Sequence, residues 1–351
     1  MRRFRSAAAV AVLFVAALSL GLASCGEKSE GGAPESEPFT LTLDFYPNPD
    51  HAGIYMAQKL GYFKEAGLDV TIQTPSDPSA PIKQVAAGRT DLAISYEPEV
   101  ILAHEQGLDV KAVGALVDTP LTSMIWLKSS KIGGIADLRG KTIATAGIPY
   151  QDAYLKTILA RAGLSTSDVT TVNVGYGLLP AIVSGKAQAM LGGFRNVEGV
   201  DLRLRGKEPV VIPVDKLGVP TYNELVFVAQ GQRLEKDSQP VRLFLAALAR
   251  GTTAAAADPQ AATEALTAAN PDLDPRLTAA EVRATLPLLK PPQRKTSGGG
   301  GGGGETQAYG EMNPEEWESF ILWMRDHGLI SGRPAPSDVL SNEYLPGRIP
   351  K

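Results

Sequence analysis

The stretch from Leu41 to Tyr55, LTLDFYPNPDHAGIY, decides how the chain around it folds. Alternating apolar residues predict a β-strand over 41–45, and the apolar spacing that follows predicts a helix over 53–65. Between the two, Pro47 and Pro49 fix their own φ angles and hold the preceding residues extended, so the turn is stiff before any ligand arrives. The side chains of this turn are therefore held at the carboxyl end of a strand, where open α/β sheets bind ligands.

The polar residues of this turn have two interpretations. In the first they only build the turn, with Asp50 as a helix cap, Asn48 bonded to its own backbone and Tyr46 packed. In the second, Tyr46, Asn48 and His51 face a ligand. Four recognition-type side chains within six residues favour the second interpretation.

The N-terminal residues have the character of an export signal. Residues 1–24 combine three arginines with an apolar run too short to be a good membrane span, which is typical of a secretory signal. The sequence Leu-Ala-Ser-Cys at 22–25 resembles the bacterial lipobox, so we expect Cys25 to be lipidated. Residues 25–38, rich in Gly, Ser, Glu and Pro, read as a flexible tether.

Composition narrows the class of partner. The chain has 351 residues and 44% hydrophobic content, enough for two ordinary domains, and its single cysteine excludes an intramolecular disulfide. Without the three leader arginines, 31 basic residues face 38 acidic ones, a net charge near −7. A mildly acidic chain with no basic run argues against nucleic acid as a partner. We expect a monomer anchored at the outer face of the bacterial cytoplasmic membrane.

The order of predicted elements indicates two α/β lobes. Strands and helices alternate from residue 39, and the same alternation restarts after about residue 124, which predicts lobe 1 over 39–124 and lobe 2 over 125–225. Residues 226–351 return to lobe 1 and are mostly helical. Within them 297–305, with seven consecutive glycines, is expected to be a disordered loop without function.

Several motifs resemble one known family, the solute-binding proteins and enzymes of thiamine-pyrimidine metabolism. The resemblance covers roughly 39–345 and rests on the Pro-Asn and His turn, on GYFKEAGLDV at 61–70, on GRTDLA at 88–93, on DLRGK at 137–141 and on NEYLP at 342–346. It implies the two-lobed type II periplasmic-binding-protein fold. Each lobe would be a mostly parallel sheet with flanking helices, and the crossing strands would fall near Thr122–Leu127 and Leu225–Val228.

The candidate ligand-binding residues all follow predicted strands. A flat aminopyrimidine needs an aromatic face, an acceptor for its exocyclic amine and a donor for a ring nitrogen. Tyr46 or Tyr96 can stack, Glu198 or Glu224 can accept, and Asn48 can do both. Asn196 has an alternative role as a helix cap, and Glu198 as a solvated helix residue. The candidates are Tyr46, Asn48, His51, Ser95, Tyr96 and Glu97 in lobe 1, and Thr145, Gly147, Tyr150, Phe194, Asn196, Glu198, Tyr222 and Glu224 in lobe 2.

An enzyme of the same family is the rival interpretation. The fungal pyrimidine-phosphate synthase that the chain also resembles uses pyridoxal phosphate, a lysine and a histidine that it consumes. Those residues would fall at Ser95 and Glu99, which cannot perform that chemistry. The three histidines are too scattered for a metal site, and residues 145–150 lack the signals of a phosphate loop. We therefore expect no catalytic residue, metal or cofactor, and an uncharged ligand.

The favoured hypothesis is a lipid-anchored solute-binding protein that delivers a thiamine-precursor pyrimidine to the permease and ATPase subunits of an ABC importer. Within this class the alternative ligands are riboflavin, another flat heterocycle or a sulfonate-type solute. A sensory binding module is a third possibility, and the synthase is the least favoured.

Overall fold

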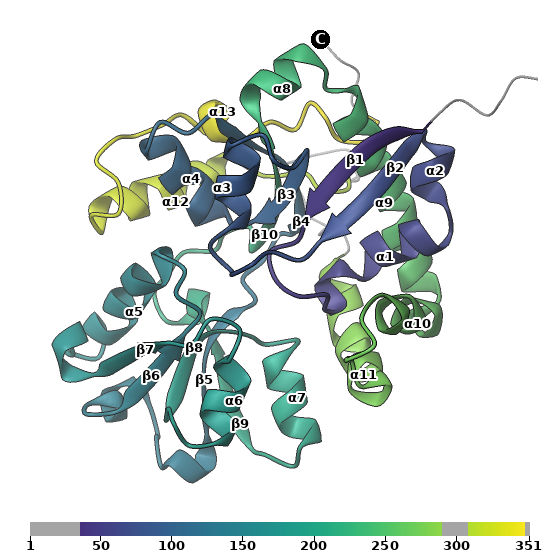
Figure 1. The fold of residues 1–351 in the computed structure, drawn as a ribbon. Helices are drawn as coiled ribbons and strands as arrows, with labels where there is room; N and C mark the ends of the chain where they lie inside the picture. The colour runs from purple at the N-terminus through teal and green to yellow at the C-terminus, as the bar shows by residue number, and fades with distance from the viewer. Residues whose placement is uncertain (1–35, 290–307, 348–351) are drawn as a thin grey trace, which may run out of the picture. The chain divides into compact units, whose positions relative to one another are not determined.

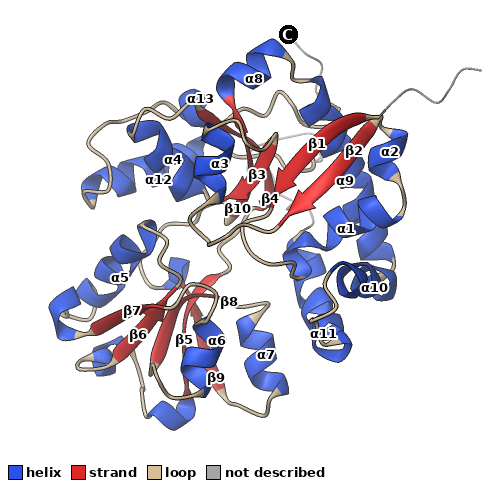
Figure 2. Cartoon of the chain, in the orientation of Figure 1, coloured by secondary structure: helices blue, strands red, loops and turns tan. Residues whose placement is uncertain are grey.

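The computed structural model describes residues 36–289 and 308–347. The predicted signal segment, the lipidation site Cys25, most of the tether and the glycine run at 297–305 lie outside the described residues. Two five-stranded sheets organise the described part, and helices flank both sheets (Figures 1 and 2). This confirms the predicted fold class.

We call the first sheet with its helices lobe 1. Its strands, in spatial order, are β2 (Leu68–Gln73), β1 (Glu37–Thr42), β3 (Leu92–Ser95), β10 (Leu225–Gln230) and β4 (Val110–Val117). Its helices before the first crossing are α1 (Ala52–Lys59), α2 (Tyr62–Glu65), α3 (Pro81–Ala86) and α4 (Glu97–Glu105), with the short 3-10 turn η1 (Pro49–His51) ahead of α1.

We call the second sheet with its helices lobe 2. Its strands, in spatial order, are β7 (Thr170–Asn173), β6 (Thr142–Thr145), β8 (Ala189–Phe194), β5 (Thr122–Leu127) and β9 (Pro209–Pro213). Its helices are α5 (Tyr150–Ala160), α6 (Leu178–Val183) and α7 (Glu198–Leu204), joined by the 3-10 turns η2 (Lys128–Ser130), η3 (Ile135–Leu138), η4 (Thr166–Asp168) and η5 (Val214–Lys216).

The helical C-terminal part packs mainly on lobe 1. Helix α9 contacts α1 and β2, α10 contacts α1, and α13 contacts α4 and β4, whereas α11 touches both η1 and α7 of lobe 2. The elements are α8 (Gly231–Lys236), α9 (Gln239–Ala257), α10 (Pro259–Ala269), α11 (Pro275–Thr285), η6 (Leu286–Leu288), α12 (Pro314–Asp326) and α13 (Pro336–Val339). Within the described ranges, no helix combines the length and hydropathy needed to cross a membrane.

The sheets are mostly parallel, as predicted, but each contains one reversed strand. In lobe 1, β1 is parallel to β2 and β3, but β10 is antiparallel to both β3 and β4. In lobe 2, β5 is likewise antiparallel to β8 and β9. The reason is the crossing: β10 and β5 are the strands by which the chain enters a lobe, so they start at the edge where β1, β3, β6 and β8 end.

Two local predictions differ from the structure. The helix predicted over 53–65 is split into α1 and α2, because Gly61 between them adopts a left-handed φ of 75°. Strand β1 ends at Thr42, not at 45, because the chain turns away from the sheet at Asp44. That early turn moves Asp44 and Phe45 from the sheet to its ligand-binding edge.

The two crossing segments, 118–121 and 214–224, are tied together by the buried carboxylate of Glu224. Its Oε2 accepts hydrogen bonds from the backbone N–H groups of Leu121 (2.6 Å) and Thr122 (2.7 Å) and from the Tyr222 hydroxyl (3.0 Å), and its Oε1 accepts from Thr122 Oγ1 (2.7 Å). One side chain from the second crossing therefore fixes the backbone of the first.

Asn223 ties the same crossing to lobe 1. Its backbone N–H donates to Glu97 Oε2 (2.7 Å), and its side-chain oxygen accepts from Trp317 Nε1 (2.6 Å) of α12. Its amide nitrogen reaches the carbonyl of Asp118 in the first crossing (3.4 Å). The crossings thus form a hydrogen-bonded hinge at the base of both lobes.

Replacing Glu224 by Gln should destabilise the protein. The NH₂ group of the amide would face the N–H and O–H groups that now donate hydrogen bonds to the carboxylate. We expect E224Q to lower the free energy of unfolding by about 1–3 kcal/mol, the usual cost of a buried unsatisfied polar group. Denaturant unfolding followed by circular dichroism measures this. The exposed Glu235, changed to Gln in α8, is the matched control and should leave the unfolding free energy unchanged; equal stability of the two variants would contradict the hinge assignment.

Candidate functional site

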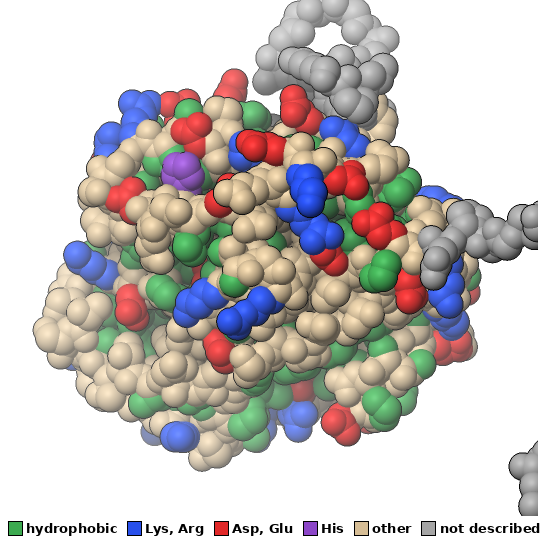
Figure 3. Space-filling view, turned by 45° about the horizontal axis from the view of Figure 1, so that its top comes forward, with side chains coloured by type: hydrophobic (Ala, Val, Ile, Leu, Met, Phe, Trp, Pro, Cys, Tyr) green, Lys and Arg blue, Asp and Glu red, His purple; other side chains and the backbone are tan. Residues whose placement is uncertain are grey.

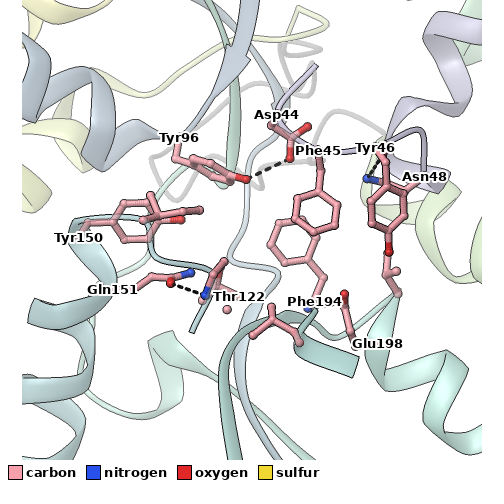
Figure 4. A pocket seen from close by; sticks show the side chains of 15 residues that line it. Asp44, Phe45, Tyr46, Asn48, Tyr96, Thr122, Tyr150, Gln151, Phe194 and Glu198 are labelled. Carbon is pink, nitrogen blue, oxygen red and sulfur yellow. Dashed lines mark hydrogen bonds between the residues drawn. The ribbon is translucent and has the colours of Figure 1, made fainter. Parts of the chain in front are cut away.

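A pocket lies between the lobes at the edge where β1, β3, β6 and β8 end (Figure 4). The atoms that line it leave about 460 Å³ between them, counted together with the open solvent at its mouth. Lobe 1 contributes Asp44, Phe45, Tyr46, Asn48 and Tyr96, and lobe 2 contributes Thr122, Ala146, Ile148, Tyr150, Gln151, Leu178, Gly192, Phe194, Val197 and Glu198.

Aromatic side chains form two walls of this pocket. Figure 4 shows Tyr96 and Tyr150 on one side and Tyr46 on the other. The rings of Tyr96 and Tyr150 come from different lobes, and their centroids are 5.6 Å apart. Phe45 packs on Tyr46 at 4.5 Å and edge-on against Tyr176 of lobe 2 at 4.4 Å. Such walls suit a flat heteroaromatic ring, which gains from stacked and edge contacts.

The carboxylate of Asp44 is held in a fixed orientation by lobe 1. Its Oδ2 accepts a hydrogen bond from the Tyr96 hydroxyl (3.1 Å), and its Oδ1 lies 2.8 Å from His51 Nε2. The backbone N–H of Asn48 donates to His51 Nδ1 (3.2 Å), so Nδ1 is an acceptor and the ring proton sits on Nε2. His51 therefore donates to Asp44, and each carboxylate oxygen keeps acceptor capacity for a ligand.

The turn that carries these groups is built by its own sequence. Asn48 caps η1 through its side-chain oxygen, which accepts from the Asp50 N–H (2.8 Å), and Pro49 occupies the first position of the turn. The amide nitrogen of Asn48 donates back to the carbonyl of Tyr46 (3.2 Å). Asn48 lines the pocket, but its amide is largely committed to holding Tyr46 in place.

Lobe 2 supplies a second carboxyl group and an amide. Glu198, at the start of α7, accepts from the Phe194 N–H through Oε2 (2.7 Å). Burial raises the pKa of Glu198 to about 7, although that hydrogen bond works in the opposite direction. Gln151 accepts from the Ala146 N–H through Oε1 (3.0 Å), which leaves its Nε2 group as the donor on the pocket side (Figure 4).

The pocket is acidic. None of the described residues that line it has a basic side chain. Asp44 of lobe 1 and Glu198 of lobe 2 both offer acceptors, while Gln151 offers a donor. An anion would meet two carboxyl groups and no counter-charge, which is electrostatically unfavourable. A neutral ring that carries an amino group and an acceptor nitrogen meets complementary partners.

The structure brings six of the predicted residues to the pocket: Tyr46, Asn48, Tyr96, Tyr150, Phe194 and Glu198. The other eight do not line it. Thr145 is buried in β6, and Gly147 (φ 77°) lies against the Asn173 side chain, where a Cβ would come within 2.2 Å of Asn173 Nδ2. His51 orients Asp44, as described above.

Four more predicted residues make structural contacts instead. Tyr222 and Glu224 bond each other within the hinge, and Glu97 anchors Asn223 there. Ser95 donates to Glu99 Oε2 (2.9 Å), so the two positions compared with the synthase residues form a buried hydrogen-bonded pair outside the pocket. The eighth, Asn196, bonds Asp50 and Thr285.

Sequence reasoning did not select Asp44 or Gln151. Asp44 falls inside the run 41–45 that the sequence predicts as a strand, and no motif sets Gln151 apart. One available signal for Asp44 was its position directly before the Phe-Tyr-Pro turn.

Comparison with known proteins places the chain in a family. The family model described as NMT1/THI5 like matches residues 48–262, more than half of the chain. The chain belongs to the NMT1/THI5-like family. This confirms the resemblance drawn from the sequence motifs.

Among NMT1/THI5-like relatives, the formylaminopyrimidine-binding protein of Halalkalibacterium halodurans is 32% identical over 92% of this chain and 95% of that protein. A Haemophilus influenzae protein with a provisional name in thiamine biosynthesis is 37% identical over 72% of this chain and 80% of its own. Proteins named 4-amino-5-hydroxymethyl-2-methylpyrimidine phosphate synthase also match, for example at 30% identity in Legionella pneumophila. The structure of the alkanesulfonate-binding protein of Xanthomonas axonopodis has a TM-score of 0.65 at 16% identity, over 88% of this chain and 99% of that one, which supports the fold.

The Glu198 carboxyl makes the stability of the protein pH-dependent. Its pKa in the folded state, about 7, is above its ordinary value of 4.5, so the folded protein holds this proton longer than the unfolded chain. Stability is then lost as pH rises from about 4.5 to about 7, by an amount on the order of 3 kcal/mol. E198Q should lose less stability over that interval, as measured by denaturant unfolding at a series of pH values. Parallel pH profiles for wild type and E198Q would contradict the assignment.

Proposed function

We propose that the protein is an exported solute-binding protein of an ABC importer and that its solute is a neutral aminopyrimidine, a precursor of thiamine. The observation that carries the proposal is the pocket between the lobes. Its walls are aromatic, each lobe supplies one carboxyl group, and Gln151 supplies a donor. The name of the Halalkalibacterium halodurans relative supports a formylaminopyrimidine as the ligand, and the names of the related synthases support a hydroxymethylpyrimidine.

The proposed binding geometry follows from the positions of these groups. The ring would lie between Tyr46 and the Tyr96–Tyr150 wall. Its exocyclic amine would donate to Asp44, whose orientation His51 and Tyr96 fix, and a ring nitrogen would accept from Gln151 Nε2. The carboxyl group of Glu198 would hydrogen-bond to the ring substituent of the ligand or to a second donor on the ligand. Because these groups come from both lobes, a bound ligand would favour the closed arrangement.

Transport would follow from closure. The closed form, with both lobes on the ligand, is the form that a permease and its ATPase subunits would receive, and opening at the permease would release the solute. Cys25, as a lipidated N-terminal residue, would tether the protein to the outer face of the cytoplasmic membrane. Figure 3 shows acidic and basic side chains interspersed on the face it draws.

A binding role is favoured over catalysis by the residues at 95 and 99. Ser95 and Glu99 hydrogen-bond each other at 2.9 Å, and neither lines the pocket. Neither side chain can form the Schiff base or donate the ring atoms that the related synthase chemistry needs. The pocket could therefore hold the same type of pyrimidine without making it.

The ligand class is tested by calorimetry of the purified protein with 4-amino-5-hydroxymethyl-2-methylpyrimidine, its formylaminomethyl analogue, riboflavin, an alkanesulfonate and nitrate. We expect heat of binding with the two pyrimidines. The sulfonate and nitrate should give none, because the lining residues include no cation and two carboxyl groups. Binding of the sulfonate but not of the pyrimidines would refute the proposal, and binding of riboflavin alone would replace the ligand while keeping the binding role.

Asp44→Asn should change which pyrimidine is preferred. In the wild type, Asp44 would accept a hydrogen bond from the 4-amino group and repel the oxygen of a 4-oxo analogue. An asparagine at this position can instead turn its N–H toward the oxo group. We expect D44N to weaken binding of the amino ligand by about 10- to 150-fold, the value of one hydrogen bond to a charged group, and to reverse the preference between the two ligands. D69N, on the exposed side of β2, is the matched control. An unchanged preference in a folded D44N protein would contradict this contact.

A further inference from the structure

Asn196 makes a buried polar contact between the lobes that lies outside the set of pocket-lining residues. It follows β8 of lobe 2, and its amide nitrogen donates to Asp50 Oδ1 (2.8 Å) and to Thr285 Oγ1 (2.8 Å). Asp50 belongs to η1 and Thr285 is the last residue of α11, both on the lobe 1 side. All three side chains are buried. Opening of the lobes would have to break both hydrogen bonds.

Two oxygens of this contact have no hydrogen-bond partner among the described residues. They are Asp50 Oδ2 and Asn196 Oδ1, each fully removed from the protein surface. A buried carboxylate oxygen without a donor is costly, and the cost falls if the carboxyl group takes up a proton, which turns the orphan acceptor into a donor. The contact therefore favours Asp50 as a neutral acid.

The charges around Asp50 act in the same direction. Burial, then the negative charge of Asp44, raises the pKa of Asp50 well above its ordinary value, and Glu198 of α7 and Glu224 of the hinge add to this. The hydrogen bond from Asn196 lowers the pKa of Asp50 but does not cancel these effects. Glu281 of α11 faces Asp50, Glu198 and Asp201, and burial followed by these charges raises the pKa of Glu281 to about 9.

Few cations offset these carboxyl groups. Arg205 is already paired with Asp201 on α7, and both ring nitrogens of His51 are used in hydrogen bonds to Asp44 and to the Asn48 N–H. Lys59 of α1 pairs with Glu264 of α10 at the surface, on the two other helices that contact η1. The remaining basic groups of α7 and α11, namely Arg203, Arg276 and Arg283, supply no hydrogen bond or ion pair to Asp50 within the described residues. Acidic groups thus dominate the surroundings of Asp50.

We propose that Asn196, Asp50 and Thr285 form a latch that stabilises the closed arrangement of the lobes independently of ligand, and that closing the latch takes up one proton on Asp50. In the open form Asp50 would meet water and ionise at its ordinary pKa. The closed form binds more protons, so low pH favours closure, and closure is lost as pH rises from about 4 toward the raised pKa. Capture of solute would then be tighter in acid surroundings.

Small-angle X-ray scattering of the ligand-free protein tests the latch whatever the solute is, so its outcome is separate from that of the proposed function. We expect the radius of gyration of the wild type to be smaller at about pH 5 than at about pH 9, because the closed form is more protonated. D50N, whose amide mimics the neutral acid, should stay compact at both pH values. N196A should be expanded at both.

Control variants separate the latch from general effects. T285V removes one of the two hydrogen bonds and should shift the transition to lower pH. T171V and D69N, at exposed positions in β7 and β2, should behave as the wild type does. A wild-type radius that does not change with pH, or a D50N variant that retains the wild-type pH response, would overturn the proposal. Circular dichroism at both pH values identifies any variant that unfolds. If N196A unfolds, the pH shift expected for T285V tests the latch in its place.

Discussion

The carboxylate of Glu224 is the interaction on which the site depends. It is buried at the point where the chain crosses between lobes, and it accepts four hydrogen bonds, two of them from backbone N–H groups more than 100 positions earlier in the sequence. A single cross-link of this kind fixes where β5 starts relative to β10. Since the pocket takes residues from both lobes, the relative placement of Asp44 and Glu198 follows from it.

Three buried acidic residues have different roles, and the hydrogen-bond donors around each one explain the difference. Glu224 has a complete ring of donors and is structural. Asp44 has two donors from its own lobe and spare acceptor capacity toward the pocket, so it suits recognition of an amino group. Asp50 has one donor, from the opposite lobe, and one oxygen with no partner, so it suits a contact that forms and breaks. The residue type alone distinguishes none of these; the number and origin of the donors does.

Sequence patterns predict most of the fold and part of the site. The stiff Pro-Asn-Pro turn, the restart of strand and helix alternation and the helical C-terminal part are local features, and the structure confirms the two-lobed fold that they predict. Two pocket residues, Tyr96 directly after β3 and Phe194 at the end of β8, follow from the rule that ligands bind at carboxyl strand ends.

The remaining roles depend on contacts that are distant in sequence. Nothing near Glu224 indicates that Leu121 and Thr122 will donate to it, and nothing near Asn196 indicates Asp50 or Thr285. Asp44 escaped notice because an alternating strand pattern extends to residue 45, whereas the chain leaves the sheet after Thr42. The mixed sheets likewise follow from the two crossings, which reverse the direction of β5 and β10, and strand composition does not record direction.

We propose above all that the interlobe pocket binds an aminopyrimidine through a hydrogen bond from its exocyclic amine to Asp44. A crystal structure of the protein grown with 4-amino-5-hydroxymethyl-2-methylpyrimidine tests it most directly. The account predicts the ring between Tyr46 and the Tyr96–Tyr150 wall, with its exocyclic nitrogen within about 3.2 Å of an Asp44 carboxylate oxygen. A ring bound elsewhere, or one whose amine faces away from Asp44 toward solvent, would contradict it.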